Sequence, residues 1–388
     1  MDYKQIKADN RRRAMQFESE MITLPGEWDG SVPFFPRYLQ IEHTNRCNAR
    51  CIMCNHLYTG NRDAMDIDIH VLYALEEILP YAETVMLNGD GEPFLCKNLR
   101  QSLALFKKYE VEIGTNTNFS YVPDDVWDYL ADGFSFLNIS CDASAKELYE
   151  KIRLGLSFDK FLQNLNHLNA KAPNLKKNLD CVLMRQNIAY MEEIVRFAAD
   201  YKFDSVRFHS LGVNPVIGNE KDYPGLYLHY LAEQIEKAKE TAQRLGIEIQ
   251  VPEIFTGREI NAEQREKEFK RIQVEEASAD ERIHHVMESE GPDLRPYLGE
   301  KVTIEDLSPA GFSFGDICRW SLERCYIDLH GNMTTCCYDV MHRYGNLSEQ
   351  SFEEIWNGKL YKMFRQEMRD GRLPDWCRHC QWIRNPVF

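Results

Sequence analysis

From residue 37 to about residue 210, short apolar runs alternate with longer segments of helical periodicity. The apolar runs predict strands at Tyr38–Glu42, Thr84–Asn88, Glu110–Thr115, Phe136–Cys141, Asn178–Leu183 and Ser205–Ser210. The segments between them predict helices that include Ile69–Leu79, Asn98–Lys108, Asp124–Ala131, Phe158–Lys171 and Tyr190–Tyr201. This alternation is typical of βαβ units around a parallel sheet. It predicts a curved sheet or a partial barrel over residues 36–250, in which functional loops follow the carboxyl ends of the strands.

Three other segments have a different pattern. Residues 1–35 are polar and charged, and they predict a solvated N-terminal arm with a short helix. Residues 224–245 predict a long amphipathic helix that Gly246 ends, followed by a strand at Ile247–Val251. Residues 251–310 are highly charged and indicate a linker or insertion. A solvated face is the simpler interpretation of this insertion, and a substrate lid or an oligomer contact is the alternative.

The pattern changes again near residue 311. Apolar runs at Tyr326–Leu329 and Met333–Cys336 enclose Gly331 and predict a hairpin. Ser351–Trp356 and Leu360–Met368 have helical periodicity. Residues 311–388 are therefore expected to form a small α+β domain.

Charge and composition exclude several classes of protein. The formal net charge is −15, which argues against a general nucleic-acid binder and against docking on anionic lipid. The first residues lack the apolar core of a secretory signal, and no run approaches the roughly 20 apolar residues that span a bilayer. We therefore expect a cytoplasmic protein without a membrane or nucleic-acid partner.

Three of the 12 cysteines lie close together after the first predicted strand. Cys47, Cys51 and Cys54 have the spacing C-x3-C-x2-C, and no fourth cysteine is near them. Thiolates favour iron–sulfur clusters or zinc, but a closed structural zinc site needs four protein ligands. Three thiolates can hold three irons of a cubane cluster and leave the fourth iron open.

A second group of cysteines lies in the C-terminal region. Cys318, Cys336, Cys377 and Cys380 offer four thiolates, two from the hairpin region and two from a C-x2-C pair. Such a set can enclose a whole cluster, although a zinc knuckle is the alternative for this group alone. Cys325 and Cys337 are not part of this set of four. Cys337 is expected to be a buried neighbour, and Cys325 could replace Cys318 as a ligand.

These motifs together resemble the radical S-adenosylmethionine (SAM) enzymes. The cysteine triplet resembles their signature, and the run Asn88–Phe94 resembles their Gly-Gly-Glu-Pro strand end. The region from Cys318 to Cys380 resembles the auxiliary-cluster module called SPASM, in its shortened twitch form. The resemblance covers residues 36–250 and 311–383, and it implies a partial (β/α)6 TIM-like barrel followed by the iron–sulfur domain.

The resemblance also implies cofactors. A [4Fe–4S] cluster on Cys47, Cys51 and Cys54 would bind SAM, and one auxiliary [4Fe–4S] cluster would use the C-terminal group as ligands. The residues that the resemblance places around SAM are Gly89, Gly91, Glu92, Asn116, Ser140, Asp142 and Arg153, with Asn118 and Asn187 as further lining residues. Gly89, Gly91 and Glu92 would meet the methionyl amine, and Arg153 would meet the carboxylate. Met53 replaces the aromatic residue that the family commonly has before its last loop cysteine.

Three functions remain open at this point. The first is an oxidoreductase that dehydrogenates or epimerises a sugar-like or other small polar substrate. The second is a maturase that oxidises or crosslinks a peptide or protein, and the third is a non-catalytic iron–sulfur or zinc scaffold. His209 is the candidate general base, with Glu42 and Asp142 as alternatives, and Cys325 is a candidate hydrogen-atom donor. A flavodoxin- or ferredoxin-type protein would supply electrons.

Overall fold

The computed structural model describes residues 1–21, 28–54, 56–59, 63–213, 218–273, 320–337 and 342–370. The chain divides into two compact units, each assembled from separated segments. Unit 1 comprises Met1–Asn45, Ala64–Thr115 and Lys301–Phe388, and unit 2 comprises Arg46–Asp63 and Asn116–Glu300. Because these units combine segments from several of the expected domains, the boundaries near residues 35, 250 and 310 stay predictions.

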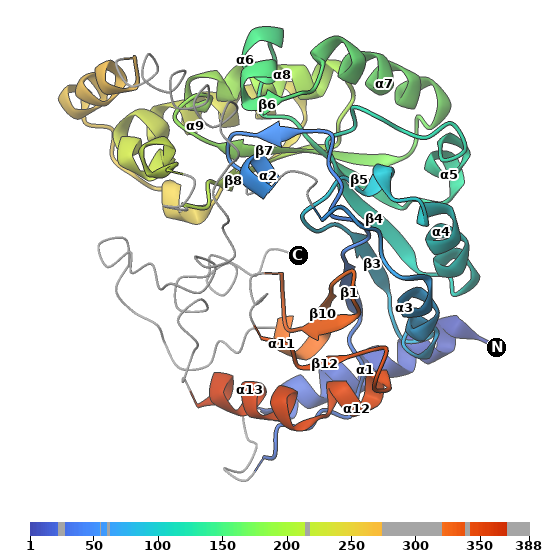
Figure 1. Ribbon diagram of the computed structural model, residues 1–388. Coiled ribbons are helices and arrows are strands. Elements are labelled where there is room, and N and C mark those ends of the chain that lie inside the picture. Colours follow the sequence, from blue (N-terminus) through green and yellow to red (C-terminus); the bar gives the residue numbers. More distant parts are fainter. Residues whose placement is uncertain are drawn as a thin grey trace. The chain divides into compact units, whose positions relative to one another are not determined.

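The sheet of unit 1 is built around strand β1 (Tyr38–Ile41), as Figure 1 shows. Strands β3 (Thr84–Leu87) and β10 (Arg324–Ile327) both pair with β1 in parallel, one on each side. Beyond β3, the first residues of β4 (Glu112–Thr117) continue the parallel order. On the other side, β10 pairs antiparallel with β11 (Asn332–Thr334). The short strand β12 (Gly345–Asn346) then pairs antiparallel with β11.

The hairpin predicted around Gly331 is confirmed by the pairing of β10 with β11. Gly331 has φ +81°, a left-handed conformation that glycine adopts without steric cost. Its N–H donates to the carbonyl of Asp328, which closes the turn. The helices that follow are α12 (Phe352–Trp356) and α13 (Lys359–Arg369), close to their expected ranges.

Helix α1 (Tyr3–Met21) differs from the expected short helix in a solvated arm. Asn10, Ala14 and Phe17 are buried in unit 1, so one side of the helix belongs to the core. Phe17 packs against the rings of Trp28 and Phe34, with centroid distances of 5.7 and 5.6 Å. The run of arginines in this helix therefore marks only its solvent-facing side. The other helical elements of unit 1 are α3 (Ile69–Ala74), η1 (Leu75–Glu77), η2 (Pro93–Leu95), α4 (Leu99–Lys108) and α11 (Trp320–Glu323).

Unit 2 contains parallel strands in the order β5 (Phe136–Ser140), β7 (Lys176–Leu183), β8 (Ser205–Ser210) and β9 (Glu248–Gln250). Helices connect the strands, as expected for βαβ units (Figure 1). These helices are α5 (Trp127–Asp132), α6 (Lys146–Ile152), α7 (Phe158–Lys171), α8 (Met191–Asp200) and α9 (Leu228–Leu245). Four single helical turns complete the unit: η3 (Ile188–Tyr190), η4 (Glu220–Asp222), η5 (Pro224–Tyr227) and η6 (Glu253–Phe255).

The two faces of the unit 2 sheet carry different side chains because successive residues of a strand point to opposite faces. Leu137, Leu179 and Val206 are fully buried on the apolar face. Asn138, Asn178 and Ser205 occupy the neighbouring positions, in register with one another on the other face. Aromatic side chains of the helices, among them Phe161 and Phe197, stack together in the core. The sheet therefore offers one polar face for a functional site.

The charged segment from residue 251 is described as far as residue 273. Residues 262–273 are helical, and Phe269 stacks on Tyr230 of α9 with a centroid distance of 5.4 Å. Ile272 is buried, so this helix is partly a packed element and not only a solvated face. Residues 274–310, where a lid was the alternative, lie outside the described residues.

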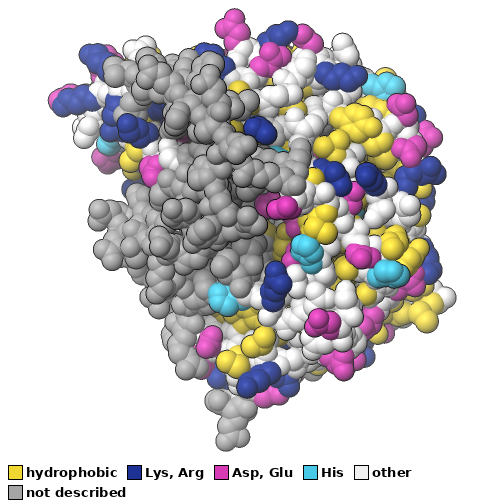
Figure 2. All heavy atoms as spheres, viewed as in Figure 1, with side chains coloured by type: hydrophobic (Ala, Val, Ile, Leu, Met, Phe, Trp, Pro, Cys, Tyr) yellow, Lys and Arg dark blue, Asp and Glu magenta, His cyan; other side chains and the backbone are white. Residues whose placement is uncertain are grey.

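On the face shown in Figure 2, acidic and basic side chains are intermixed.

None of the helices in the described part of the chain is long and apolar enough to cross a membrane.

Candidate active site

The cysteine loop of unit 2 begins directly after the segment that contains β1. Cys47, Cys51 and Cys54 are all partly exposed. The N–H of Ala49 donates to Cys47 Sγ at 3.5 Å, and the N–H of His56 donates to Cys54 Sγ at 3.4 Å. Backbone donors of this kind orient and stabilise cluster-bound thiolates. These hydrogen bonds therefore stabilise negative charge on the sulfurs of Cys47 and Cys54.

The arrangement of these donors favours a cluster over a single ion. Among the described residues, no three His, Cys, Asp or Glu side chains converge on one possible metal position. A tetrahedral zinc needs its sulfur ligands about 2.3 Å from one centre. Each iron of a cubane has its own corner, so the three thiolates need not converge. The donor set of the loop thus fits a [4Fe–4S] cluster.

A short antiparallel pair places a cation beside the loop. Strand β2 (Arg50–Cys51) pairs with β6 (Arg153–Leu154), and Cys51 lies directly opposite Arg153. Arg153 Nη1 lies 4.0 Å from Cys51 Sγ. Burial raises the pKa of the Cys51 thiol to about 12, while the positive charge of Arg153 acts against this rise. Arg153 therefore favours the thiolate form that a metal ligand requires.

Arg153 also forms an ion pair with a buried carboxylate. Its Nη2 lies 2.6 Å from Asp142 Oδ2, and both side chains are almost inaccessible to solvent. Asp142 Oδ1 accepts the N–H of Val182 at 2.8 Å. Arg153 Nε is buried without a hydrogen-bond partner in the described structure. The structure thus brings two of the predicted SAM residues together next to Cys51, and their contacts with SAM stay predictions.

Asparagine side chains hold this region of unit 2. Asn118 donates to Asn48 Oδ1 at 2.9 Å, and Asn48 donates to Ser120 Oγ at 2.8 Å, which joins the cysteine loop to the segment after β4. Asn187 is fully buried and donates to the carbonyls of Val182 and Asp142 at 2.8 and 3.2 Å. Through these hydrogen bonds Asn187 and Asn118 stabilise the local structure, in addition to their predicted contacts with SAM.

A ladder of side-chain hydrogen bonds crosses the polar face of unit 2. Asn138 donates to Asn116 Oδ1 at 2.8 Å, and Asn178 donates to Asn138 Oδ1 at 2.9 Å. Ser205 donates to Asn178 Oδ1 at 2.8 Å. The ladder fixes the orientation of the Asn116 amide, one of the predicted SAM residues. It also forms an uncharged layer of polar groups in the sheet.

A charged layer follows two residues further along the same strands. Ser140, Asp180 and Arg207 lie in register on β5, β7 and β8. Asp180 accepts two hydrogen bonds from Arg207, at 2.7 and 2.8 Å. His209 Nε2 lies 3.5 Å from Asp180 Oδ1, and about 29% of the His209 side chain is exposed. His209, the predicted base, thus lies beside a carboxylate, with its Nε2 buried and its ring partly exposed.

The ionisation of Asp180 reflects its neighbours. Burial by itself raises its pKa, but the partners His209 and Arg207 outweigh burial, so the pKa lies below the ordinary value. Asp180 and Arg207 are not among the predicted site residues, because both lie inside predicted strands. The alternation of polar residues at 178 and 180, and at 205, 207 and 209, was the available signal.

The strand end that resembles Gly-Gly-Glu-Pro lies in unit 1. Glu92 is buried, and its Oε1 accepts the N–H of Phe94 at 3.3 Å, so it caps η2. Gly89 lies against Glu42, whose Cγ is only 2.4 Å from the position that a Cβ on Gly89 would occupy. Any larger residue at position 89 would collide with Glu42, which explains the glycine. The contacts of Gly89, Gly91 and Glu92 with SAM stay predictions.

The C-terminal cysteines are only partly described. Cys336 and Cys337 are partly exposed after β11, whereas Cys318, Cys377 and Cys380 lie outside the described residues. Cys325 is fully buried on β10 opposite Leu39, and burial raises the pKa of its thiol. A buried thiol of this kind behaves as a small apolar side chain. The hydrogen-donor and ligand roles considered for Cys325 stay predictions.

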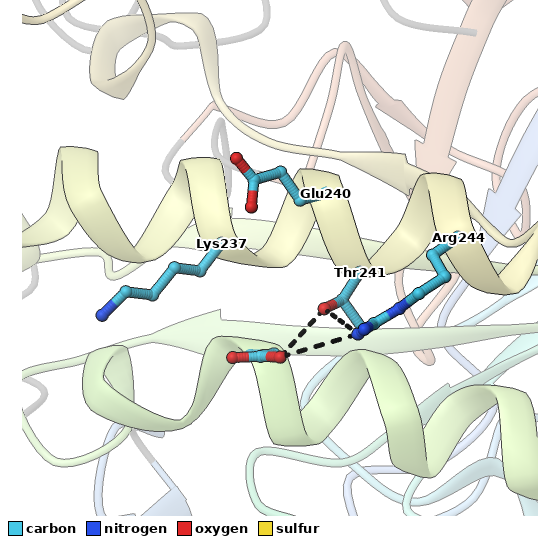
Figure 3. A pocket seen from close by; sticks show the side chains of 5 residues that line it. Lys237, Glu240, Thr241 and Arg244 are labelled. Atoms are coloured by element: carbon cyan, nitrogen blue, oxygen red, sulfur yellow. Dashed lines mark hydrogen bonds and ion pairs between the residues drawn. The ribbon is translucent and has the colours of Figure 1, made fainter.

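A surface pocket of about 330 Å³ lies between α8 and α9 (Figure 3). It is lined by Glu192, Lys237, Glu240, Thr241 and Arg244. Glu192 accepts a hydrogen bond from Thr241 at 2.9 Å and lies 3.9 Å from Arg244, so three of the lining side chains contact one another. None of the predicted site residues lines this pocket, and we assign it no function.

Comparison with known families identifies two regions of the chain. Residues 41–198 match the model of the radical SAM superfamily. Residues 318–381 match the model of the SPASM iron–sulfur cluster-binding domain. The first match contains the cysteine loop, and the second contains all four cysteines expected around the auxiliary cluster.

Curated relatives are distant. A tungsten-containing aldehyde ferredoxin oxidoreductase cofactor-modifying protein of Pyrococcus furiosus is 23% identical over 185 residues, covering 45% of this chain and 51% of the relative. A GTP 3′,8-cyclase of Rhizobium etli is 24% identical over 202 residues, covering 49% of this chain and 56% of the relative. The chain therefore spans about half the length of these relatives.

Solved structures share the fold. SuiB of Streptococcus suis bound to S-adenosylmethionine has a TM-score of 0.59 at 15% identity, covering 85% of this chain and 68% of SuiB. The structure of anSMEcpe with bound AdoMet and a peptide has a TM-score of 0.58 at 15% identity, covering 90% of this chain and 88% of that one. The fold expected from the sequence, an α/β radical SAM domain with a C-terminal iron–sulfur domain, is confirmed. The chain thus contains a radical SAM superfamily region at residues 41–198 and a SPASM domain at residues 318–381, and together they imply a SAM-binding [4Fe–4S] cluster and auxiliary iron–sulfur binding.

Proposed function

We propose that this protein is a radical SAM oxidoreductase that removes a hydrogen atom, a proton and an electron from a polar substrate. When reduced and bound to SAM, the cluster supplies a 5′-deoxyadenosyl radical that takes the hydrogen atom from a substrate carbon. The observation that carries this proposal is the Asp180–Arg207–His209 group on the polar face of unit 2. These residues offer hydrogen bonds to a substrate and a group that can accept a proton.

Residues of unit 2 hold the reactive groups in this proposal. Cys47, Cys51 and Cys54 are the ligands of the SAM-binding cluster, and Arg153 stabilises the Cys51 thiolate. Arg153 Nε, which has no hydrogen-bond partner among the described residues, is the group that we propose for the SAM carboxylate. In unit 1, backbone groups of Gly89 and Gly91 and the Glu92 carboxylate would receive the methionyl amine.

His209 is the proposed proton acceptor. After hydrogen abstraction from a carbon that carries a hydroxyl group, loss of the hydroxyl proton and of one electron yields a ketone. Asp180 Oδ1 lies 3.5 Å from the imidazole Nε2 and would help to place the ring against a substrate. Cys318, Cys336, Cys377 and Cys380 are the proposed ligands of an auxiliary cluster, which would accept the electron. A flavodoxin- or ferredoxin-type donor would supply the electron that starts the reaction.

The polar face of unit 2 favours a sugar-like or other small hydroxylated substrate. Its amide ladder and Asp180–Arg207 pair can donate and accept hydrogen bonds without carrying a large net charge. A second candidate is a peptide substrate. It is supported by the similar structures, since SuiB was solved bound to the precursor peptide SuiA and anSMEcpe with a peptide.

The general proposal is tested by SAM cleavage. Anaerobically reconstituted protein, given SAM and dithionite, should release 5′-deoxyadenosine, and the Cys51→Ala variant should lose both this product and part of its iron. Cys181→Ala is the matched control because Cys181 is a fully buried cysteine of unit 2 on β7. Wild-type protein that holds iron but releases no 5′-deoxyadenosine would contradict the proposal.

The role of His209 is tested once a substrate is found among hydroxylated small molecules and peptides. His209→Gln should lower oxidised product by about 10²- to 10⁴-fold, the usual contribution of a general base, and leave SAM cleavage intact. His229→Gln is the control, since His229 is a partly exposed residue of α9 whose Nδ1 lies 3.0 Å from the carbonyl oxygen of Glu259 and 3.4 Å from the backbone nitrogen of Asn261, away from the polar face. Equal product from His209→Gln and wild type would exclude His209 as the base.

A further inference from the structure

Three polar side chains of unit 2 form a closed ring of hydrogen bonds, which we call the Asn48 ring. Asn118 Nδ2 donates to Asn48 Oδ1 at 2.9 Å, and Asn48 Nδ2 donates to Ser120 Oγ at 2.8 Å. The Ser120 hydroxyl donates to Asn118 Oδ1 at 2.6 Å, so each side chain donates once and accepts once within the ring. Hydrogen bonds in such a chain polarise and strengthen one another. Asn118 and Ser120 are buried and Asn48 is exposed, so the ring ties the cysteine loop to a buried turn.

The turn that contains Asn118 and Ser120 has a strained backbone. Phe119 is fully buried and has φ +52°, in the left-handed region that bulky side chains rarely adopt. Glu110 and Lys202, the other non-glycine residues with positive φ in the described part of the chain, are exposed and follow the ends of α4 and α8. Left-handed residues are common at such helix ends, but Phe119 follows a strand. Strained residues persist only where the surrounding structure fixes them, and they concentrate at functional sites.

Side-chain hydrogen bonds hold this turn in its conformation. Thr117 Oγ1 accepts the N–H of Phe119 at 2.9 Å, and Asn164 on α7 donates to the carbonyl of Phe119 at 2.9 Å. Asn118 Oδ1 also accepts the N–H of Ser120 at 2.9 Å. Both backbone polar groups of the strained residue are therefore fixed by side chains. The turn presents the two buried members of the ring from a well-defined position.

The cysteine loop is held in different ways at its two ends. At Cys51, the pairing of β2 with β6 places the backbone opposite Arg153. Beside Cys47, the side chain of Asn48 belongs to the ring. Gly155, with φ +88°, lies against the same residue, since a Cβ on it would come within 3.2 Å of the Asn48 carbonyl oxygen. The strand pair thus fixes one cysteine, and the ring fixes the backbone next to another.

We propose that the Asn48 ring positions the cysteine loop for the SAM-binding cluster by fixing Cys47 relative to Cys51 before iron binds. Groups that orient metal ligands contribute to metal affinity, because a ligand that is already in place loses less freedom on binding. Asn48 and Ser120 are positioning residues in this proposal, since they act on the cluster through Cys47. The inference rests on the proposed role of the cysteine loop in holding that cluster.

Two residues outside the ring provide matched controls. Ser102 is fully buried on α4, and its hydroxyl donates to the carbonyl of Asn98 at 3.0 Å. Asn169 on α7 donates to the carbonyl of Tyr201 at 3.0 Å. Replacing either by alanine removes the same chemical group as the ring variants do, without a contact to the cysteine loop.

The first test measures how firmly the reconstituted full chain holds its iron. The iron that wild type holds in excess of Cys51→Ala measures the SAM-binding cluster. The concentration of the chelator bathophenanthroline that removes half of this iron should fall about tenfold in Ser120→Ala and in Asn48→Ala, and stay unchanged in Ser102→Ala. The Asn48→Ala/Ser120→Ala double variant should fall no further, since both changes break one ring. Wild-type retention of iron in both single variants would overturn the proposal.

A spectroscopic test separates positioning from a general loss of stability. The electron paramagnetic resonance spectrum of the reduced protein with SAM should change in Ser120→Ala and in Asn48→Ala. It should match wild type in the controls Ser102→Ala and Asn169→Ala. Wild-type spectra in both ring variants would contradict the positioning role.

A third readout needs neither iron nor SAM. Hydrogen exchange of the backbone around Ala49 should be faster in Ser120→Ala and Asn48→Ala than in wild type, and unchanged in Ser102→Ala. Wild-type protein that holds no more iron than Cys51→Ala would contradict the proposed function of the loop, whereas the exchange measurement would still decide whether the ring orders it. Unchanged exchange in both ring variants would overturn the inference independently.

Discussion

Unit 2 contains two aspartate–arginine pairs that differ in depth and in partners. Asp142 and Arg153 are almost inaccessible, with side-chain exposures of 0% and 6%. Asp180 and Arg207 retain 13% and 15%, and Asp180 also has His209 beside it. The first pair lies beside Cys51, and the second lies on the polar face of the sheet.

The pKa values of the two carboxyl groups move in opposite directions. For Asp142, complete burial raises the pKa, although Arg153 and the N–H of Val182 act against the rise. For Asp180, the neighbours His209 and Arg207 outweigh burial and lower the pKa. Both carboxyl groups are paired with an arginine, so the pairing alone does not set the direction of the pKa shift. The number of partners and the remaining exposure to water decide it. The deep pair suits a fixed charge beside a cluster, and the shallower pair suits contact with a substrate.

The largest expected effect is a loss of stability at the deeper pair, Asp142–Arg153. Arg153→Leu should destabilise the protein by about 3–5 kcal/mol, because it leaves Asp142 buried without a compensating charge. Urea unfolding under anaerobic conditions measures the loss. The Arg153→Leu/Asp142→Leu double variant should recover much of it, and a single variant as stable as wild type would contradict the assigned ion pair.

A smaller effect is expected at the second pair, and it depends on pH. Asp180→Asn should cost roughly 2 kcal/mol, the contribution of hydrogen bonds to a charged group. Because the folded-state pKa of Asp180 is lowered, this stabilisation is complete above the unfolded-state pKa of about 3.9 and is lost as pH falls through the folded value. Unfolding at several pH values should show wild type and variant converging only in acid, and convergence near neutral pH would refute the lowered pKa.

Geometry at the second pair is tested by a change that keeps the charge. Arg207→Lys should cost about 1 kcal/mol, since lysine cannot reproduce the two parallel hydrogen bonds to Asp180. Thermal unfolding of the variant beside Arg207→Leu provides the measurement. A lysine variant as unstable as the leucine variant would mean that shape, not charge, holds Asp180.

The smallest effect is expected at the surface pocket between α8 and α9. Glu192→Gln should change stability by at most about 0.5 kcal/mol, because solvent screens its pairs with Arg196 and Arg244. Denaturant midpoints in low and high salt would check this expectation. A loss comparable to that of Asp180→Asn would show that depth does not explain the difference between the pairs.

The sequence predicted the elements whose signals are local. The six central strands appear as apolar runs, and the cysteine spacing predicts a cluster loop without any three-dimensional information. Boundaries shifted by a few residues where a single helical turn precedes a helix, as at Pro224–Tyr227 before α9. Such turns share the helical periodicity and are not separable from it in the sequence.

The sequence did not predict features that depend on distant partners. Strands β2 and β6 have two residues each, too few for any periodicity, yet they place Arg153 opposite Cys51. The burial of α1 was obscured by its arginines, because its apolar positions are few and widely spaced. Glu42 was considered only as a possible base, since its contacts come from β3 and β10, which no local pattern joins to β1.

The position of β1 between β3 and β10 has a consequence for synthesis. As the chain leaves the ribosome from its amino end, β1 emerges early, whereas β10 emerges only after most of the chain has been made. One edge of β1 therefore stays without its partner during much of translation, and exposed strand edges promote aggregation. We expect a nascent chain stalled before Arg324 to depend on chaperones that shield this edge.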